Sequence, residues 1–156
     1  MDRLQQFIEK NGLKAKIVKL ETPTLTVDQA VKAVNCEPED IVKSIIVTTD
    51  TGEFYLTLLP GDRNIKAKKL KRLLGVKDLW LASPDQVEKA SGYEVGGVPP
   101  INVDLPVIID ERVLTRKQVY GGGGASNQLL YISVQEILDH TDSETADISK
   151  PIRAKK

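Results

Sequence analysis

The stretch from Ile41 to Thr48, IVKSIIVT, decides how the rest of the chain is organised. It is almost wholly apolar and rich in β-branched residues, which predicts a central strand buried on both faces. The turn residues at 50–53, DTGE, and the apolar run at 54–59, FYLTLL, then predict the returning strand of a β-hairpin. The exception within the strand is Lys43, because burying an ammonium is costly unless it meets an anion, lines a cleft or reaches water.

Helical and strand patterns surround this hairpin without a regular β–α–β alternation. Helices are expected over residues 2–11, 27–34, 65–74, 84–91 and 134–138, and further strands over 13–20, 79–82, 106–110, 118–120 and 129–132. Residues 61–64 (GDRN) are expected to break the chain. The predicted fold is therefore α+β, a central and mostly antiparallel sheet flanked by helices.

Length and composition predict one soluble domain over residues 1–140, followed by a polar, flexible tail over 141–156. The net charge of zero argues against a protein that binds polyanions with its whole surface. The beginning of the chain has no apolar signal region and no segment approaches 18 consecutive apolar residues, so a cytoplasmic protein with no membrane partner is expected. A monomer is expected as well.

Several kinds of catalytic site are excluded by residue counts. One cysteine, Cys36, permits no internal disulfide, and one histidine, His140, permits no multi-histidine zinc site, so neither a metal nor another cofactor is expected. Acidic neighbours should raise the pKa of the Cys36 thiol, which argues against a nucleophile. No serine is expected to form a triad with the one histidine at the end of the last predicted helix.

Two glycine-rich segments are candidates for binding. GYEVGGVPP at 92–100 can be neither helix nor interior strand, and its glycine N–H groups are able to hold an oxyanion, a carboxylate or a phosphate; an ordinary connecting loop explains the same composition equally well. GGGG at 121–124 lacks the spacing of a phosphate-binding loop and precedes a strand, so a flexible turn is favoured. For Lys43 itself, a side chain that reaches solvent remains the alternative to a ligand in a cleft.

The order of these segments resembles the YbaK/ProX family of aminoacyl-tRNA deacylases, the domain that is also inserted in bacterial prolyl-tRNA synthetases. The resemblance is carried by IVKSIIV, GEFYLTLLPGDRNIKAKKLKRLLG, LASPDQVEKASGYEVGGVPP, PVIIDERVL, VYGGGG and LLYIS. It covers about residues 1–140, and the strand lysine followed by G-x-x-x-P is specific in combination.

The resemblance implies hydrolysis, in trans, of the ester in a wrongly charged tRNA, bearing Ala, Cys or Ser, with tRNA-Pro as one such tRNA. It places the family's lysine on Lys43, which would contact the terminal nucleotide, and its G-x-x-x-P on Gly96–Pro100, whose backbone would hold the ester carbonyl. Lys43 and Gly96 are accordingly the expected catalytic residues. The expected substrate-binding residues are Thr22, Ile45, Val47, Gly97, Val98, Pro99, Pro100, Gly122, Gly123, Gly124 and Ser126.

The basic stretch at 66–72 is a candidate contact with the tRNA backbone, and a transient contact with a synthetase is a further expectation. Many relatives carry arginine or lysine after the late glycines, where this chain has Ala125–Ser126–Asn127, and this departure puts a phosphate contact there in doubt. Two other classes of function remain: a non-catalytic module that binds tRNA 3′ ends or nucleotides, and a protein-interaction domain.

Overall fold

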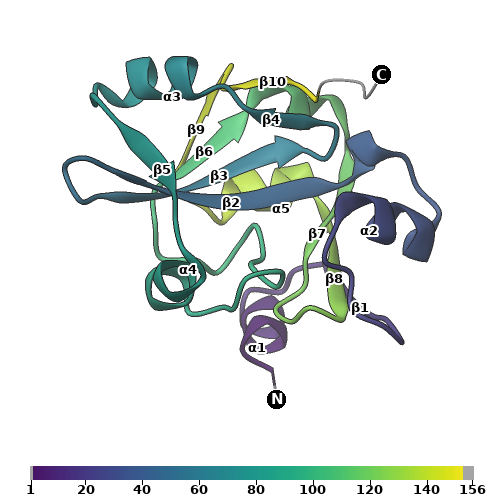
Figure 1. Ribbon diagram of the computed structural model, residues 1–156. Helices are drawn as coiled ribbons and strands as arrows, with labels where there is room; N and C mark the ends of the chain where they lie inside the picture. Colours follow the sequence, from purple (N-terminus) through teal and green to yellow (C-terminus); the bar gives the residue numbers. More distant parts are fainter. Residues whose placement is uncertain (1, 153–156) are drawn as a thin grey trace.

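The hairpin at 42–60 lies at the centre of the computed structural model, which describes residues 2–152 (Figure 1). The helices are α1 (Arg3–Lys10), α2 (Val27–Val34), α3 (Ala67–Leu74), α4 (Pro84–Ser91) and α5 (Val134–Asp139), with 3-10 turns η1 (Pro38–Asp40) and η2 (Glu111–Thr115). The strands are β1 (Lys16–Lys19), β2 (Val42–Thr49), β3 (Phe54–Pro60), β4 (Arg63–Ile65), β5 (Leu79–Leu81), β6 (Val107–Asp110), β7 (Gln118–Gly122), β8 (Gln128–Ser133), β9 (Ser143–Ala146) and β10 (Ser149–Pro151).

The largest sheet has the strand order β5-β2-β3-β6-β9. Strand β2 is antiparallel to both of its neighbours, as expected for the hairpin, whereas β6 runs parallel to β3 and to β9. The antiparallel strands β1-β8-β7 form a second sheet, and β10 pairs with β4. The α+β class is confirmed, and most strand pairs are antiparallel.

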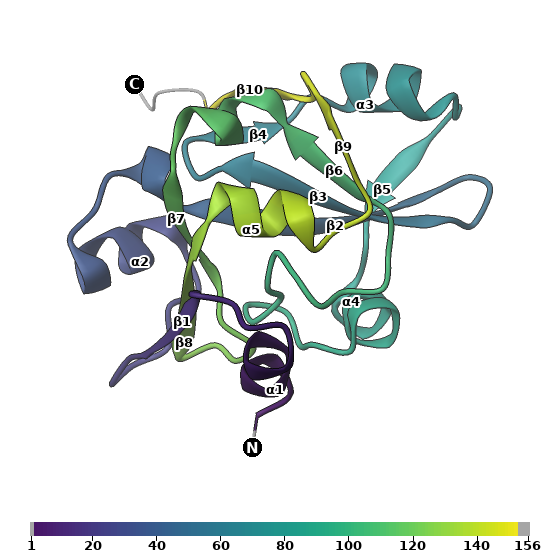
Figure 2. The ribbon, with the colours of Figure 1, turned by 180° about the vertical axis from the view of Figure 1, so that it is seen from behind.

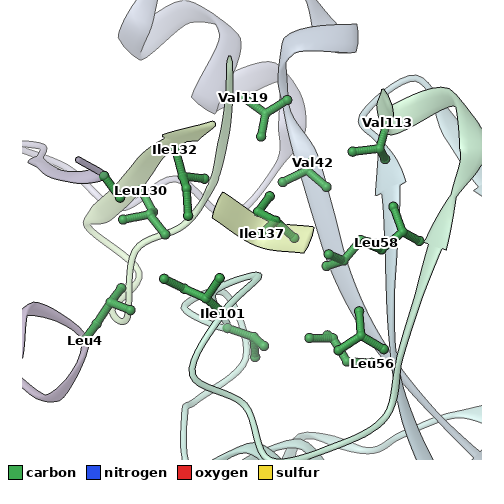
Figure 3. Close-up of a cluster of buried hydrophobic side chains, with 14 of the residues drawn as sticks. Leu4, Val42, Leu56, Leu58, Ile101, Val113, Val119, Leu130, Ile132 and Ile137 are labelled. Carbon is green, nitrogen blue, oxygen red and sulfur yellow. The ribbon is translucent and has the colours of Figure 1, made fainter. Parts of the chain in front are cut away.

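Two apolar clusters cover the two faces of the large sheet. On one face, Val42 and Ile46 belong to the main core, in which Leu4 of α1, Ile137 of α5 and residues of β7 and β8 converge (Figure 3). On the other face, Val47 packs with Leu70 of α3 and with other residues that are buried there. Figure 2 shows α5 across one side of the sheet and α3 at the edge near β4 and β10. The burial of β2 on both faces, which its sequence predicts, is therefore confirmed.

The helix boundaries follow from their caps. The Oγ1 of Thr26 accepts a hydrogen bond from the backbone N–H of Gln29 at the start of α2, and the Ser83 hydroxyl does the same for α4. Gly75 and Gly92 end α3 and α4 in the left-handed conformation that glycine adopts at little cost.

The prediction of a flexible tail from residue 141 is wrong for residues 143–151. Strand β9 adds to the edge of β6, β10 pairs with β4, and the side chain of Ile148 between them is fully buried. The polar sequence is explained by two edge strands that are largely solvent-facing, while a single isoleucine supplies the apolar anchor. Residues 153–156 of the expected tail lie outside the described residues.

Two smaller expectations are also wrong. Residues 63–65 form β4 rather than an irregular break, because β10, whose strand pattern was not recognised, provides their partner. The helical spacing of Leu70, Leu73 and Leu74 predicts that all three point inward from α3, but Leu73 is 37% exposed. Within residues 2–152, no helix has the length and apolar character that crossing a membrane requires.

Candidate active site

A pocket of about 230 Å³ lies against the edge of β2 that faces away from β3. Along this edge β5 pairs only with residues 47–49, and a single β-bridge joins Ile41 to Tyr120 of β7. On this edge, no described strand pairs with residues 43–45, which lie between these two contacts. The pocket is lined by Thr24, Leu25, Thr26, Val27, Ala30, Ile41, Val42, Lys43, Ser44, Ile45, Gly96, Val98, Gly121, Gly122 and Leu129.

Lys43 is the one ionisable side chain that lines this pocket among the described residues. The side chain is half-buried, and its ammonium donates a 3.2 Å hydrogen bond to Oδ1 of Asn64 in β4. Burial lowers the pKa of Lys43 below its usual value of 10.5, while the nearby carboxylate of Asp62 acts in the opposite direction. The structure thus places the lysine at the pocket. Its ammonium has the neutral amide of Asn64 as hydrogen-bond partner and the carboxylate of Asp62 as the nearby opposite charge.

The opposite wall of the pocket includes a tight turn at Gly96. The N–H of Gly97 bonds to the carbonyl of Glu94 at 3.0 Å, and Gly96 has φ of +89°, the value required of the third residue in a type II turn. Within residues 2–152, neither the N–H of Gly96 nor that of Val98 donates a hydrogen bond to another group. Both residues line the pocket, so two backbone donors remain available to a bound oxyanion or carbonyl.

The late glycine segment holds this turn in place by close backbone packing. The N–H of Gly124 donates a 2.8 Å hydrogen bond to the carbonyl of Gly97. A Cβ atom on Gly97 would lie 2.8 Å from the nitrogen of Ala125, and one on Gly122 would clash with the carbonyl oxygen of Val98. Gly122 therefore allows the two chain segments to touch, so this stretch is packed and differs from the flexible turn that its composition predicted.

Among the remaining predicted site residues, one lines the pocket and the others do not. Ile45 is at the pocket, whereas Pro99 and Pro100 are buried behind it and stiffen the turn. Gly123 packs on the backbone of Gln128, Gly124 packs near Leu4, and Ser126 lies beside Gly96, its Cβ 3.9 Å from the point where a Cβ of that glycine would lie. None of these three lines the pocket.

Two predicted residues are placed away from the pocket. Val47 is fully buried in the apolar cluster on the α3 side of the sheet, so it supports the strand and does not shape the pocket wall. Thr22 is exposed and does not line the pocket. The neighbouring chain segment that does line it begins two residues later, at Thr24.

Sequence reasoning missed the wall made by residues 24–27 and Ala30 at the start of α2. The cap signal at Thr26 located this helix, but nothing in the sequence indicated that its first turn faces Lys43. Ser44 was also missed as a pocket residue; its Oγ is buried and has no hydrogen-bond partner among the described residues. The position of this serine directly after the strand lysine was the one sequence signal that could have indicated it as a pocket residue.

Residues 2–152 offer little support for a cysteine nucleophile or a metal centre. The pKa of the Cys36 thiol is raised, by burial and by the carboxylates of Asp40 and Glu37, which is the direction that its acidic neighbours predicted. In the part of the chain that the structure describes, no three His, Cys, Asp or Glu side chains gather in a way that could hold a metal ion.

Comparisons with known proteins agree with this geometry. Proline–tRNA ligases of Desulfotalea psychrophila and Caldicellulosiruptor bescii are 32% and 34% identical over 90% and 80% of this chain. The chain spans only about a quarter of those ligases, 24% and 22% of their lengths. Among solved structures, one described as a candidate trans-editing enzyme for prolyl tRNA synthetase is 33% identical, with a TM-score of 0.86 over 95% of both chains. A crystal structure of a hypothetical protein has a TM-score of 0.88 at 34% identity and covers 96% of this chain.

The model of one protein family, described as the aminoacyl-tRNA editing domain, matches residues 21–140, which include the whole pocket. The match extends from the segment before α2, through Lys43 and the Gly96 turn, to the end of α5. The chain belongs to the family of aminoacyl-tRNA editing domains.

Proposed function

We propose that this protein hydrolyses, in trans, the ester bond between a wrongly attached amino acid and the 3′-terminal ribose of a tRNA. The observation that carries the proposal is the meeting of one ammonium, Lys43, and the two free backbone donors of Gly96 and Val98 in a single small pocket. Action in trans is supported by the similarity, over nearly the whole of both chains, to the structure described as a candidate trans-editing enzyme.

Lys43 holds the nucleotide end of the substrate. Among residues 2–152 its ammonium donates one hydrogen bond, so two of its three N–H groups are free for a phosphate or ribose oxygen. Asn64 fixes the direction of the side chain, and the open edge of β2 leaves room beside it. The tRNA end therefore enters along β2.

The backbone at Gly96 and Val98 holds the carbonyl of the ester. A water oxygen adds to the carbonyl carbon, and the two N–H groups stabilise the oxygen on which negative charge develops. The bond from this carbon to the ribose oxygen then breaks, the ribose oxygen takes a proton, and the amino acid leaves with a carboxyl group. Membership of the editing-domain family implies that the ribose hydroxyl next to the ester relays the proton of the attacking water, and this fits a pocket in which no carboxylate or imidazole lies among the described lining residues.

The amino acid side chain lies toward α2, between Ala30, Val27 and Leu25. A volume of about 230 Å³ is smaller than a typical ligand pocket of ~300–1,000 Å³, which favours small residues such as alanine, cysteine or serine. A separate editing pocket of this size is useful, because one methylene or hydroxyl changes the free energy with which a synthetase binds an amino acid by only ~1–3 kcal/mol.

The test is release of amino acid from tRNA-Pro charged separately with alanine, cysteine, serine or proline. Wild type should hydrolyse one or more of the wrongly charged species and spare the proline ester, and Lys43→Ala should lose at least about 100-fold in kcat/KM, equivalent to ~2.7 kcal/mol. Lys10→Ala, which removes an exposed charge from the end of α1, is the matched control and should keep wild-type activity. If enzyme in excess cleaves no ester yet still binds the tRNA end, the protein is a binding module and the proposal fails.

A further inference from the structure

The start of α1 is attached to the chain on both sides of the Gly96 turn. Helix α1 precedes residues 21–140, which the family model matches, and none of the described residues that line the pocket belongs to it. Figure 2 shows α1 beside the loop that follows α4. Two consecutive side chains, Asp2 and Arg3, reach this region by separate routes.

Arg3 holds the chain where it leaves α4. Its Nη1 donates a 3.1 Å hydrogen bond to the carbonyl of Gly92, the residue that ends α4, and a Cβ atom on that glycine would meet the guanidinium. The guanidinium also lies over the ring of Tyr93, 4.7 Å from its centroid, as a cation–π contact. The hydroxyl of Tyr93 accepts a 2.7 Å hydrogen bond from the side-chain amide of Asn102. The buried ring is therefore held at both ends, three residues before Gly96.

Asp2 holds the late glycine segment, which packs on the turn. One oxygen of its carboxylate caps α1, and the other accepts a 3.2 Å hydrogen bond from the side-chain amide of Gln128. The same amide nitrogen donates a 2.8 Å hydrogen bond to the carbonyl of Gly123. The next residue, Gly124, donates its own N–H to the carbonyl of Gly97. This second route therefore ends on the turn itself.

The two free donors of the turn are useful only in the right place. Backbone N–H groups stabilise a developing oxyanion when they lie about 2.7–3.1 Å from it. A displacement of roughly 1 Å at a catalytic site can cost about 10²-fold in rate, even when the altered residue is remote from the chemistry. Contacts that fix both flanks of the turn can therefore control the rate without touching the substrate.

We propose that Asp2 and Arg3 are positioning residues, which hold the Gly96 turn where its two free N–H groups meet the ester carbonyl. This inference rests on the proposed function, because it assumes that these N–H groups stabilise the oxyanion. Arg3 fixes the segment before the turn, and Asp2, through Gln128, fixes the segment packed on it. Both act on the chemical step and leave binding of the tRNA end to Lys43.

Steady-state deacylation by Arg3→Ala tests the first route, with tRNA-Pro that carries the amino acid released by wild type. The kcat should fall at least about tenfold while KM stays within about twofold, because the contact matters in the transition state. Arg3→Lys retains a cation for Tyr93 and a donor for Gly92, so it should restore most of the loss. Lys10→Ala, at the other end of α1, is the control and should keep wild-type kcat. A wild-type kcat in Arg3→Ala, or a rise in KM alone, would overturn the proposal.

Asp2→Ser tests the second route, because serine caps a helix but is too short to bind Gln128 as well. It should lower kcat, whereas Asp2→Asn, which keeps an oxygen for Gln128, should restore it. Asp2 and Arg3 are both exposed, so the Tm of each variant should fall by no more than roughly 2–4 °C. Wild-type kcat in Asp2→Ser would remove Asp2 from the proposal.

Amide hydrogen exchange observes the turn without catalysis. The N–H groups of Gly97 and Gly124 are hydrogen-bonded, and their exchange should become several-fold faster in Arg3→Ala and Asp2→Ser but not in Lys10→Ala. Faster exchange at all protected amides together would mean that the two residues only stabilise the fold, and would overturn the proposal. Faster exchange confined to the turn, in a protein without deacylase activity, would instead refute the proposed function and leave the link between α1 and the turn in place.

Discussion

Asn64 accepts a hydrogen bond from the ammonium of Lys43 at 3.2 Å, and within residues 2–152 this is the one hydrogen bond that the ammonium makes. The two residues lie on β4 and β2, strands that do not pair with each other. The position of β4 therefore controls where the lysine points, and β4 is in turn held by β10.

Asn64→Ala should reduce kcat/KM about tenfold, because the Lys43 side chain loses its one hydrogen-bonded anchor to the protein. Asn64 is exposed, so the free energy of unfolding should change by less than about 0.5 kcal/mol. Steady-state deacylation and urea denaturation measure the two effects. A loss as large as that of Lys43→Ala would mean that Asn64 contacts the substrate itself.

Binding of the tRNA end should weaken at a lower pH than an ordinary lysine would allow. Burial lowers the pKa of Lys43, so the ammonium loses its proton before pH 10.5 and the attraction to phosphate is lost with it. The unfolded chain keeps that proton up to a higher pH than the folded protein does. The contribution of this residue to the free energy of unfolding therefore rises as the pH approaches 10.5. Affinity for uncharged tRNA between pH 7 and pH 10 is the measurement, and Lys43→Arg should abolish the alkaline loss. An identical pH profile for wild type and Lys43→Arg would contradict the assignment.

Gly97→Ala should destabilise the protein by about 2 kcal/mol or more and reduce activity, because its Cβ would meet the backbone of Ala125 at 2.8 Å and push the turn away. Gly75→Ala is the contrasting control, since Gly75, unlike Gly97, has a positive φ, of +69°, but no atom within 4 Å of its Cβ position. It should cost about 1 kcal/mol of left-handed strain and leave the deacylation rate unchanged. Thermal denaturation and kcat of both variants separate packing from conformational strain, and equal losses of activity would refute the role given to the contact.

Ala30→Val should narrow the pocket on the α2 side and shift its preference toward smaller amino acids. Ala30 is 4% exposed and lines the pocket, so two added methyl groups occupy volume that the substrate side chain needs. We expect the ratio of kcat/KM for a larger over a smaller aminoacyl group to fall about tenfold. Leu25→Ala, which removes a side chain that is 70% exposed on the same wall, should change the ratio in the opposite direction. Unchanged ratios in both variants would show that α2 does not contact the amino acid.

Ile148→Ala should lower the free energy of unfolding by about 2–5 kcal/mol, because its fully buried side chain joins Val47 and Leu70 in the cluster under α3. Ile152→Ala, at 47% exposure, should cost less than about 0.5 kcal/mol. Urea denaturation of the two variants is the measurement. A small effect at Ile148 would support the flexible tail that the sequence predicted.

The elements that could be predicted are those with strong local signals. The β2–β3 hairpin is specified by its apolar run and turn, and α2 and α4 by the caps Thr26 and Ser83. The strands β4, β9 and β10 escaped prediction because each is only three or four residues long and two of them pair across more than eighty residues of sequence. Such strands form because a partner is available, and their own composition carries little information.

At the site, the strand lysine and the Gly96 turn could be found because each breaks a local rule of its segment. Of the late glycines predicted to bind substrate, Gly122 lines the pocket and its missing Cβ lets its backbone meet that of Val98, whereas Gly124 reaches the turn through its hydrogen bond to Gly97. The α2 wall could not be found, because which face of a helix meets a strand depends on tertiary packing. Val47 was misplaced for a simpler reason: alternation gives the face of the sheet but not which residues on it α3 covers.

The two walls of the pocket differ in what a mutation can alter. At Gly96, Gly121 and Gly122 the wall is main chain, so it is the same whatever side chains the neighbouring positions carry. Across from it, the first turns of α2 offer side chains such as Val27 and Ala30, which can be exchanged without disturbing any backbone contact described above. Under the proposed function, selectivity can therefore change through single substitutions in one short helix, while the backbone donors at Gly96 and Val98 stay the same. Redesign toward a new misacylated substrate should begin at α2 and leave the glycine segments intact.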